Sequence, residues 1–157
     1  MSDDTVKPKR ILVVEDEADL RVYISRVFEE GGFRTACAED GDEALRAVEK
    51  ERPDLITLDL SLPGTSGVRA YRTLKSRPET ADIPVIFITG VTGPGGSRDT
   101  ERFYFNRRQM PPPEGFLAKP VDPQQVLALA TKLLSLTSTR NQPEQEPTTK
   151  EEGLAAP

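Results

Sequence analysis

The stretch "DLITLDLSLPG", residues 54–64, combines a predicted buried strand with a carboxylate at its end. Its first half is apolar and β-branched, which is typical of a strand buried in a sheet. The strand ends on a carboxylate, Asp59, and a Pro-Gly turn follows almost at once. A carboxylate without a partner beside a dry core is costly, or takes up a proton and becomes neutral. Asp59 is therefore either an ordinary solvated strand end or the place where a cation is bound.

Strands alternate with helices along most of the chain. An apolar stripe at helical spacing, from Leu20 to Phe28, predicts the first helix, and Gly31-Gly32 ends it. Asp122 is the expected N-cap of the last helix and Pro123 its first residue. The predicted strands lie at 11–14, 33–38, 54–60, 83–90 and 115–119, and the helices at 20–28, 42–50, 68–74 and 122–136. This order predicts an α/β fold, a doubly wound parallel sheet with helices on both faces.

Composition excludes several classes of function. The chain has 157 residues and a formal charge of −5, which argues against nucleic acid as a partner. It contains no histidine, so catalysis by a Ser-His or Cys-His pair is excluded. The single cysteine, Cys37, forms no internal disulfide and is expected to be a small buried residue of the second strand. No stretch is long enough to insert into a membrane, and we expect a cytoplasmic protein.

Carboxylate, hydroxyl and ammonium side chains stand at the ends of four of the predicted strands. Ligands of open parallel sheets bind at the carboxyl ends of the strands. Glu15-Asp16, Asp59, Thr89 and Lys119 are the residues placed there. Three neighbouring carboxylates repel one another unless a cation lies among them, and oxygen ligands favour Mg²⁺. A carboxylate beside Mg²⁺ can attack phosphorus, while a hydroxyl and a lysine bind the phosphoryl oxygens. We therefore interpret Asp59 as a phosphoacceptor.

Each of these residues also has an ordinary interpretation. Strand-end acids are usually solvated, Thr89 on its own is a strand-end hydroxyl, and Lys119 on its own is a surface lysine. The phosphoacceptor hypothesis rests on four independent positions that agree on one site.

The motifs "ILVVEDE", "PDLITLDLSLPGTSG", "PVIFITG" and "GFLAKP" occur in the order found in the receiver domains of two-component response regulators, which this chain resembles from Lys9 to Leu136. The resemblance implies a flavodoxin-like sheet of strand order 2-1-3-4-5. It implies that a histidine kinase or a histidine phosphotransfer protein phosphorylates Asp59. It also implies a Mg²⁺ site formed by Asp16, Asp59, the backbone carbonyl of Ser61 and, largely through water, Glu15.

The resemblance assigns roles to the remaining site residues as well. Thr89 would move toward the phosphoryl oxygens and Lys119 would pair with them. The bond between Lys119 and Pro120 would be cis. Phe116 matches an aromatic residue that rotates inward on activation, although it can equally be a residue of the core.

The chain departs from the family between the fourth and fifth strands. The segment "GVTGPGGSRDTERFYFNRRQMPPPE", residues 90–114, is longer than usual and lacks a clear amphipathic fourth helix. It is rich in arginine and aromatic residues, for which a solvated face is the default interpretation, and our hypothesis is that a downstream protein target contacts this segment. The polar, proline-containing residues from Ser138 onward predict disorder. The expected organisation is an N-terminal extension at 1–8, a receiver domain at 9–137 and a disordered tail at 138–157.

Alternatives from other classes fit less well. A flavin-binding domain of the same strand order needs a phosphate cradle where Glu15-Asp16 stands. Aspartate-dependent phosphatases carry a second acid two residues after the nucleophile, where this chain has Ser61. A third alternative, a receiver-like docking module that works without phosphorylation, is not excluded by the sequence. We expect a single-domain response regulator that signals by protein contact. It would not be an enzyme in the ordinary sense, although it would catalyse its own Mg²⁺-dependent phosphorylation and its slow dephosphorylation.

Overall fold

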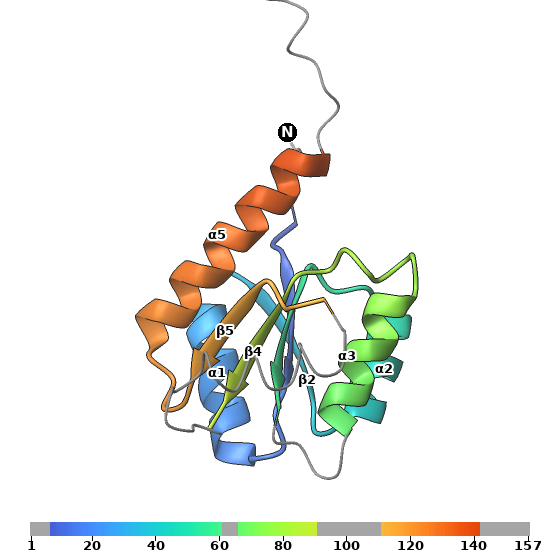
Figure 1. Cartoon of the computed structure of the whole chain (residues 1–157). Coiled ribbons are helices and arrows are strands. Elements are labelled where there is room, and N and C mark those ends of the chain that lie inside the picture. Colours follow the sequence, from blue (N-terminus) through green and yellow to red (C-terminus); the bar gives the residue numbers. More distant parts are fainter. Residues whose placement is uncertain (1–6, 61–65, 91–110, 142–157) are drawn as a thin grey trace, which may run out of the picture.

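The computed structural model describes residues 7–60, 66–90 and 111–141. The expected architecture is confirmed: one parallel sheet of five strands in the order β2-β1-β3-β4-β5 carries helices on both faces (Figure 1). The strands are β1 (Arg10–Val14), β2 (Arg34–Ala38), β3 (Leu55–Asp59), β4 (Val85–Thr89) and β5 (Gly115–Ala118). The helices are α1 (Ala18–Glu30), α2 (Gly41–Lys50), α3 (Ser66–Ser76) and α5 (Pro123–Asn141).

The sheet divides the core into two layers. Successive side chains of a strand point to opposite faces, so Ile11 and Val13 of β1 pack with α1 and α5, while Leu12 and Val14 pack with α2 and α3. Both faces of the inner strands are buried, which explains their continuous apolar sequence. Figure 1 shows α1 and α5 on one side of the sheet and α2 and α3 on the other.

The helix ends follow the predicted signals. Gly32 has φ +96°, a backbone conformation that glycine adopts without strain, and the chain turns there from α1 into β2. At the start of α5, the Asp122 carboxylate accepts hydrogen bonds from the backbone N–H groups of Gln124 and Gln125, at 3.0 and 3.4 Å. Asp122 is therefore the N-cap, as predicted.

Helix α5 is longer than the sequence pattern suggests. It continues to Asn141, so residues 138–141, which composition assigns to the disordered tail, are helical. The apolar face of α5 anchors the helix as far as Leu134, and no proline interrupts it before Pro143. Residues 142–157, the remainder of the predicted tail, lie outside the described part of the chain.

Cys37 is exposed, contrary to the expectation that it is buried. It lies on β2, an edge strand of the sheet, where β1 is the only neighbouring strand that the described residues supply. Its Sγ atom lies 3.1 Å from the Ser25 hydroxyl of α1, which covers this edge only in part.

Candidate functional site

The carboxyl ends of four strands bring the predicted site residues to one edge of the sheet. Strands β1 and β3 pair Val14 with Leu58, so the residues that follow, Glu15 and Asp59, emerge side by side. Thr89 is the last residue of β4 and pairs with Ala118, the residue before Lys119. The Lys119 N–H donates to the Thr89 carbonyl at 2.9 Å, which extends this pairing by one step.

Glu15, Asp16 and Asp59 form a compact acidic cluster. Each offers a carboxylate oxygen, and these oxygens all lie within 4.8 Å of one another. Glu15 and Asp59 are almost fully buried, at 1% and 2% exposure, whereas Asp16 is exposed. Burial weakens the screening of their mutual repulsion, so the cluster favours the binding of cations.

Lys119 supplies one positive charge. Its Nζ atom lies 3.2 Å from Asp59 Oδ2 and 3.4 Å from Glu15 Oε1. Burial by itself would lower the pKa of Lys119, but the Asp59 and Glu15 carboxylates outweigh burial, and the pKa is raised above its usual value. Lys119 therefore stays protonated at neutral pH. The peptide bond that follows it, to Pro120, is cis, as the resemblance implies.

One lysine does not balance the charge of three acids. Burial, and secondarily the negative charge of Asp59, raises the pKa of Glu15 to about 7 without a bound metal. The hydrogen bond from the Glu17 N–H, at 3.1 Å, and the nearby Lys119 act in the opposite direction. Near neutral pH the metal-free site thus holds a proton on Glu15 for part of the time, and a bound cation would displace that proton.

The donor set fits a hard divalent cation. All three side chains offer carboxylate oxygens, and the exposed position of Asp16 leaves one side open to water and to a phosphate-bearing ligand. Mg²⁺ prefers such sites because it keeps several of its waters. The predicted fourth ligand, the backbone carbonyl of Ser61, lies outside the described residues.

Thr89 and Phe116 occupy different parts of the site region. Thr89 is fully buried at the end of β4. Phe116 lies on β5 directly opposite Phe87, with ring centroids 6.1 Å apart, and packs against the core layer that faces α2 and α3. Both the core role and the switch role of Phe116 are compatible with this position. Most of segment 90–114, the predicted contact surface, lies outside the described residues.

Sequence reasoning missed the contacts of Arg21. This residue of α1 donates from Nη1 to the backbone carbonyl of Glu15 at 2.8 Å, and its Nη2 atom lies 3.6 Å from the Glu39 carboxylate. The only signal in the sequence was an arginine one helical turn after Glu17.

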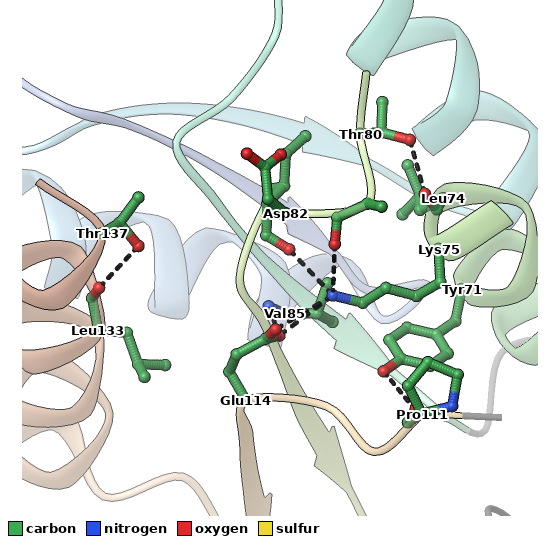
Figure 2. A network of polar contacts seen from close by, with 12 residues as sticks. Tyr71, Leu74, Lys75, Thr80, Asp82, Val85, Pro111, Glu114, Leu133 and Thr137 are labelled. Carbon is green, nitrogen blue, oxygen red and sulfur yellow. Dashed lines mark hydrogen bonds and ion pairs between the residues drawn. The ribbon is translucent and has the colours of Figure 1, made fainter. Parts of the chain in front are cut away.

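A second missed feature lies at the opposite end of the sheet (Figure 2). The Lys75 ammonium of α3 lies 3.2 Å from Glu114 Oε2 and donates to the Ala81 carbonyl at 3.1 Å. Glu114 Oε1 also accepts from the Val85 N–H at 2.8 Å, at the start of β4. The Tyr71 hydroxyl donates to the Pro111 carbonyl at 2.7 Å, and burial, followed by Glu114, raises the pKa of Tyr71, so this donor stays protonated. These contacts attach residues 111–114 to α3 and β4.

The fold and the acidic edge define a receiver-type phosphoacceptor domain, and the comparisons identify its family. The sequence model of the family "response regulator receiver domain" matches residues 11–131, and the chain belongs to this family. Protein Rrf1 of Nitratidesulfovibrio vulgaris is 31% identical over 150 residues, which cover 96% of this chain and 97% of that protein. The phosphate regulon transcriptional regulatory protein PhoB of Escherichia coli is 47% identical over 81 residues, which cover 52% of this chain but only 35% of PhoB.

Solved structures agree with this assignment. The signal receiver domain of a signal transduction histidine kinase from Syntrophus aciditrophicus superposes with a TM-score of 0.71 at 29% identity, covering 88% of this chain and 98% of that one. The receiver domain of NtrX from Brucella abortus superposes with a TM-score of 0.66 at 28% identity, covering 80% and 98%. Receiver domains are signalling phosphoacceptors rather than enzymes in the ordinary sense. Within the described residues, no helix has the length and apolar character needed to span a bilayer.

Proposed function

We propose that the protein is a response regulator that accepts a phosphoryl group on Asp59 from a histidine kinase or a histidine phosphotransfer protein. The observation that carries this proposal is the convergence of three carboxylates and Lys119 at the carboxyl edge of the sheet. A merely structural cluster would not need three acids so close together, two of them buried.

In the proposed step, a carboxylate oxygen of Asp59 attacks the phosphorus of a phosphohistidine. The new P–O bond forms as the P–N bond breaks, and the electron pair of that bond returns to the imidazole nitrogen of the donor. A Mg²⁺ ion held by Glu15, Asp16 and Asp59 would neutralise the carboxylates and polarise the phosphoryl oxygens. Loss of the phosphoryl group is the attack of water on the same phosphorus, which releases phosphate and restores the Asp59 carboxylate.

Lys119 and Thr89 would bind the phosphoryl oxygens. Lys119 already lies at Asp59, so it can exchange part of its ion pair with the carboxylate for one with the more highly charged phosphoryl group. Thr89 ends the strand next to β3 and would donate its hydroxyl to the same group. Its movement, accompanied by rotation of Phe116, would report phosphorylation to the adjoining segment.

The output would be a protein contact through residues 90–114. This segment begins directly after Thr89 and ends directly before β5, which carries Phe116 and leads to Lys119, so both of its ends adjoin elements of the site. We propose that the regulator acts in the cytoplasm by contact with a downstream protein, with neither nucleic acid nor membrane as its target.

The deciding experiment incubates the protein with Mg²⁺ and acetyl phosphate, and locates the label by mass spectrometry of the intact protein and its peptides. We expect one phosphoryl group on Asp59 and no labelling when Mg²⁺ is removed with a chelator. Beryllofluoride, a phosphoryl mimic, should in parallel shift the amide NMR signals of Asp59, Thr89 and Lys119. A folded protein that responds to neither reagent would be a docking module that works without phosphorylation.

A further inference from the structure

The loop that carries Glu15 and Asp16 is short and is held from outside by Arg21. Only residues 15–17 separate the end of β1 from the start of α1. Arg21 lies on the first turns of α1, where its N–H donates to the Glu17 carbonyl at 2.9 Å. Its guanidinium turns back to the same loop and donates to the Glu15 carbonyl at 2.8 Å.

Arg21 also connects this loop to the next one at the same edge of the sheet. Its second terminal nitrogen, Nη2, lies 3.6 Å from the carboxylate of Glu39, which follows β2. The backbone of Glu39 is held because its N–H donates to Glu43 Oε1 at 2.7 Å, in the first turn of α2. The Arg21 side chain is only 16% exposed, whereas its partner Glu39 is 66% exposed, so the contact with the Glu15 carbonyl is the better protected of the two. One guanidinium thus joins α1 and the loops after β1 and β2.

All the polar groups of Glu15 are occupied as a result. Its N–H donates to the Ala38 carbonyl at 3.0 Å, and its carbonyl accepts from Arg21. Its carboxylate oxygens are divided between the Glu17 N–H at 3.1 Å and Lys119 at 3.4 Å. Arg21 is the one side chain in this set that holds the backbone of Glu15 and makes no contact with the carboxylates of the cluster.

We propose that Arg21 is a positioning residue for the cation site: by holding the Glu15 carbonyl and Glu39 together, it fixes the loop from which Glu15 and Asp16 offer their oxygens. The inference deepens the proposed function and rests on its Mg²⁺ site. Asp16 depends on this contact most, because it is exposed and its position follows the backbone of the loop. Groups that orient metal ligands without touching the metal commonly contribute about tenfold or more to metal affinity.

The planar fork of arginine is suited to this role. Two nitrogens of one guanidinium reach two partners in fixed directions, whereas the three donors of a lysine ammonium share one freely rotating atom and do not set the direction of each contact. The positive charge also lies beside the acidic cluster and remains when the cluster binds a cation. Geometry, rather than this charge alone, is therefore what the test must isolate.

The test compares Arg21→Met, Arg21→Lys and, as a matched control, Arg26→Met in the full-length protein. Met keeps the aliphatic stem but has no donor, and Lys keeps the charge but not the fork. Arg26 is an exposed arginine of the same helix. Mg²⁺ is titrated without a phosphodonor and followed by the amide NMR signals of Glu15, Asp16 and Asp59. Circular dichroism establishes a temperature at which every variant is folded.

We expect Arg21→Met to weaken Mg²⁺ binding about tenfold. Arg21→Lys should weaken it less but measurably, and Arg26→Met should leave it unchanged. If Arg21→Met does not fold, Arg21→Lys alone decides. Wild-type Mg²⁺ affinity in either Arg21 variant overturns the inference, as does an equal loss in Arg26→Met. Labelling separates this inference from the proposed function: wild-type protein that binds Mg²⁺ but is not phosphorylated would refute the function and leave the role of Arg21 standing.

Discussion

The Lys119 ammonium lies 3.2 Å from the Asp59 carboxylate although 60 residues separate them in the chain. The contact forms because β3 and β5, the strands that precede these residues, flank β4 and end at the same edge of the sheet. In the metal-free protein, Lys119 therefore compensates part of the charge of the group that we propose as the phosphoacceptor.

Asp59→Asn should abolish phosphorylation and leave the fold intact. The amide is nearly the same size as the carboxylate but cannot form the acyl phosphate. The substitution removes one of the buried charges that repel Glu15, which offsets the loss of the ion pair to Lys119. The checks are mass spectrometry after acetyl phosphate treatment and thermal unfolding. Stoichiometric labelling of the variant would place the acceptor elsewhere in the chain.

The raised pKa of Glu15 makes the stability of the metal-free protein depend on pH. The pKa of Glu15 is 4.5 for the free side chain and about 7 in the folded protein, so the folded state holds this proton more tightly than the unfolded chain. The contribution of the Glu15 proton to the free energy of unfolding is fully present below about pH 4.5. It declines as the unfolded chain loses the proton and is gone above about pH 7. Asp59, Lys119 and Asp16 are the charged groups that face the same carboxylate.

Mg²⁺ competes with the same proton. We expect the Mg²⁺ affinity to rise between about pH 6 and about pH 8, and Mg²⁺ to restore the stability lost over this range. Asp59→Asn should lower the pKa of Glu15, because Asp59 is its main charged neighbour of like sign. Carboxyl ¹³C NMR titration of Glu15 measures both effects. An unchanged Glu15 pKa in Asp59→Asn would show that burial alone raises it.

The fold and the residues at the strand ends can be predicted from the sequence, but the side-chain contacts that position them cannot. Alternating apolar strands and helices predict the sheet, and parallel strands necessarily bring their carboxyl ends together, so Glu15, Asp59 and Lys119 are found by topology alone. Two contacts are different: Arg21 with the Glu15 carbonyl, and Lys75 with Glu114, which is 39 residues away in the chain. Both depend on the conformation that a long, flexible side chain adopts. Residue periodicity contains no information on that.

The two failed expectations have the same physical origin, because both depend on what covers an element. Cys37 follows the alternation of a buried strand, but β2 lies at the edge of the sheet and remains accessible. Residues 138–141 are polar, yet they continue a helix that α5 has already anchored through Val126, Ala130 and Leu134.

Phe116→Leu separates the switch role of Phe116 from its role in the core. Leucine keeps most of the apolar contact with Phe87 but loses the aromatic ring, so the fold should tolerate it. If Phe116 reports phosphorylation, Mg²⁺ binding and labelling of Asp59 should be unchanged, whereas the NMR shifts that beryllofluoride induces in residues 90–114 should shrink. Undiminished shifts in that segment would leave Phe116 as a core residue only.

The ion pair between Lys75 and Glu114 should contribute to stability but not to phosphorylation. It lies at the amino-terminal ends of β4 and β5, opposite the acidic cluster, and the Lys75 side chain is only 9% exposed. Glu114→Gln retains a carbonyl oxygen that can accept from the Val85 N–H, so it removes the charge with little change in shape. Lys75→Met keeps the aliphatic stem of the lysine and removes the ammonium, which lies 5.6 Å from the centroid of the Tyr71 ring.

A double-mutant cycle with these two substitutions isolates the pair. We expect a coupling free energy of about 1 kcal/mol from urea unfolding, since the two groups touch and one of them is shielded from water. Both single variants should be labelled on Asp59 at the wild-type rate at a temperature where they are folded. A coupling energy near zero would mean that Lys75 is held by the carbonyls of Ala81 and Ile83 alone. Slower labelling would instead reveal a connection between the two ends of the sheet.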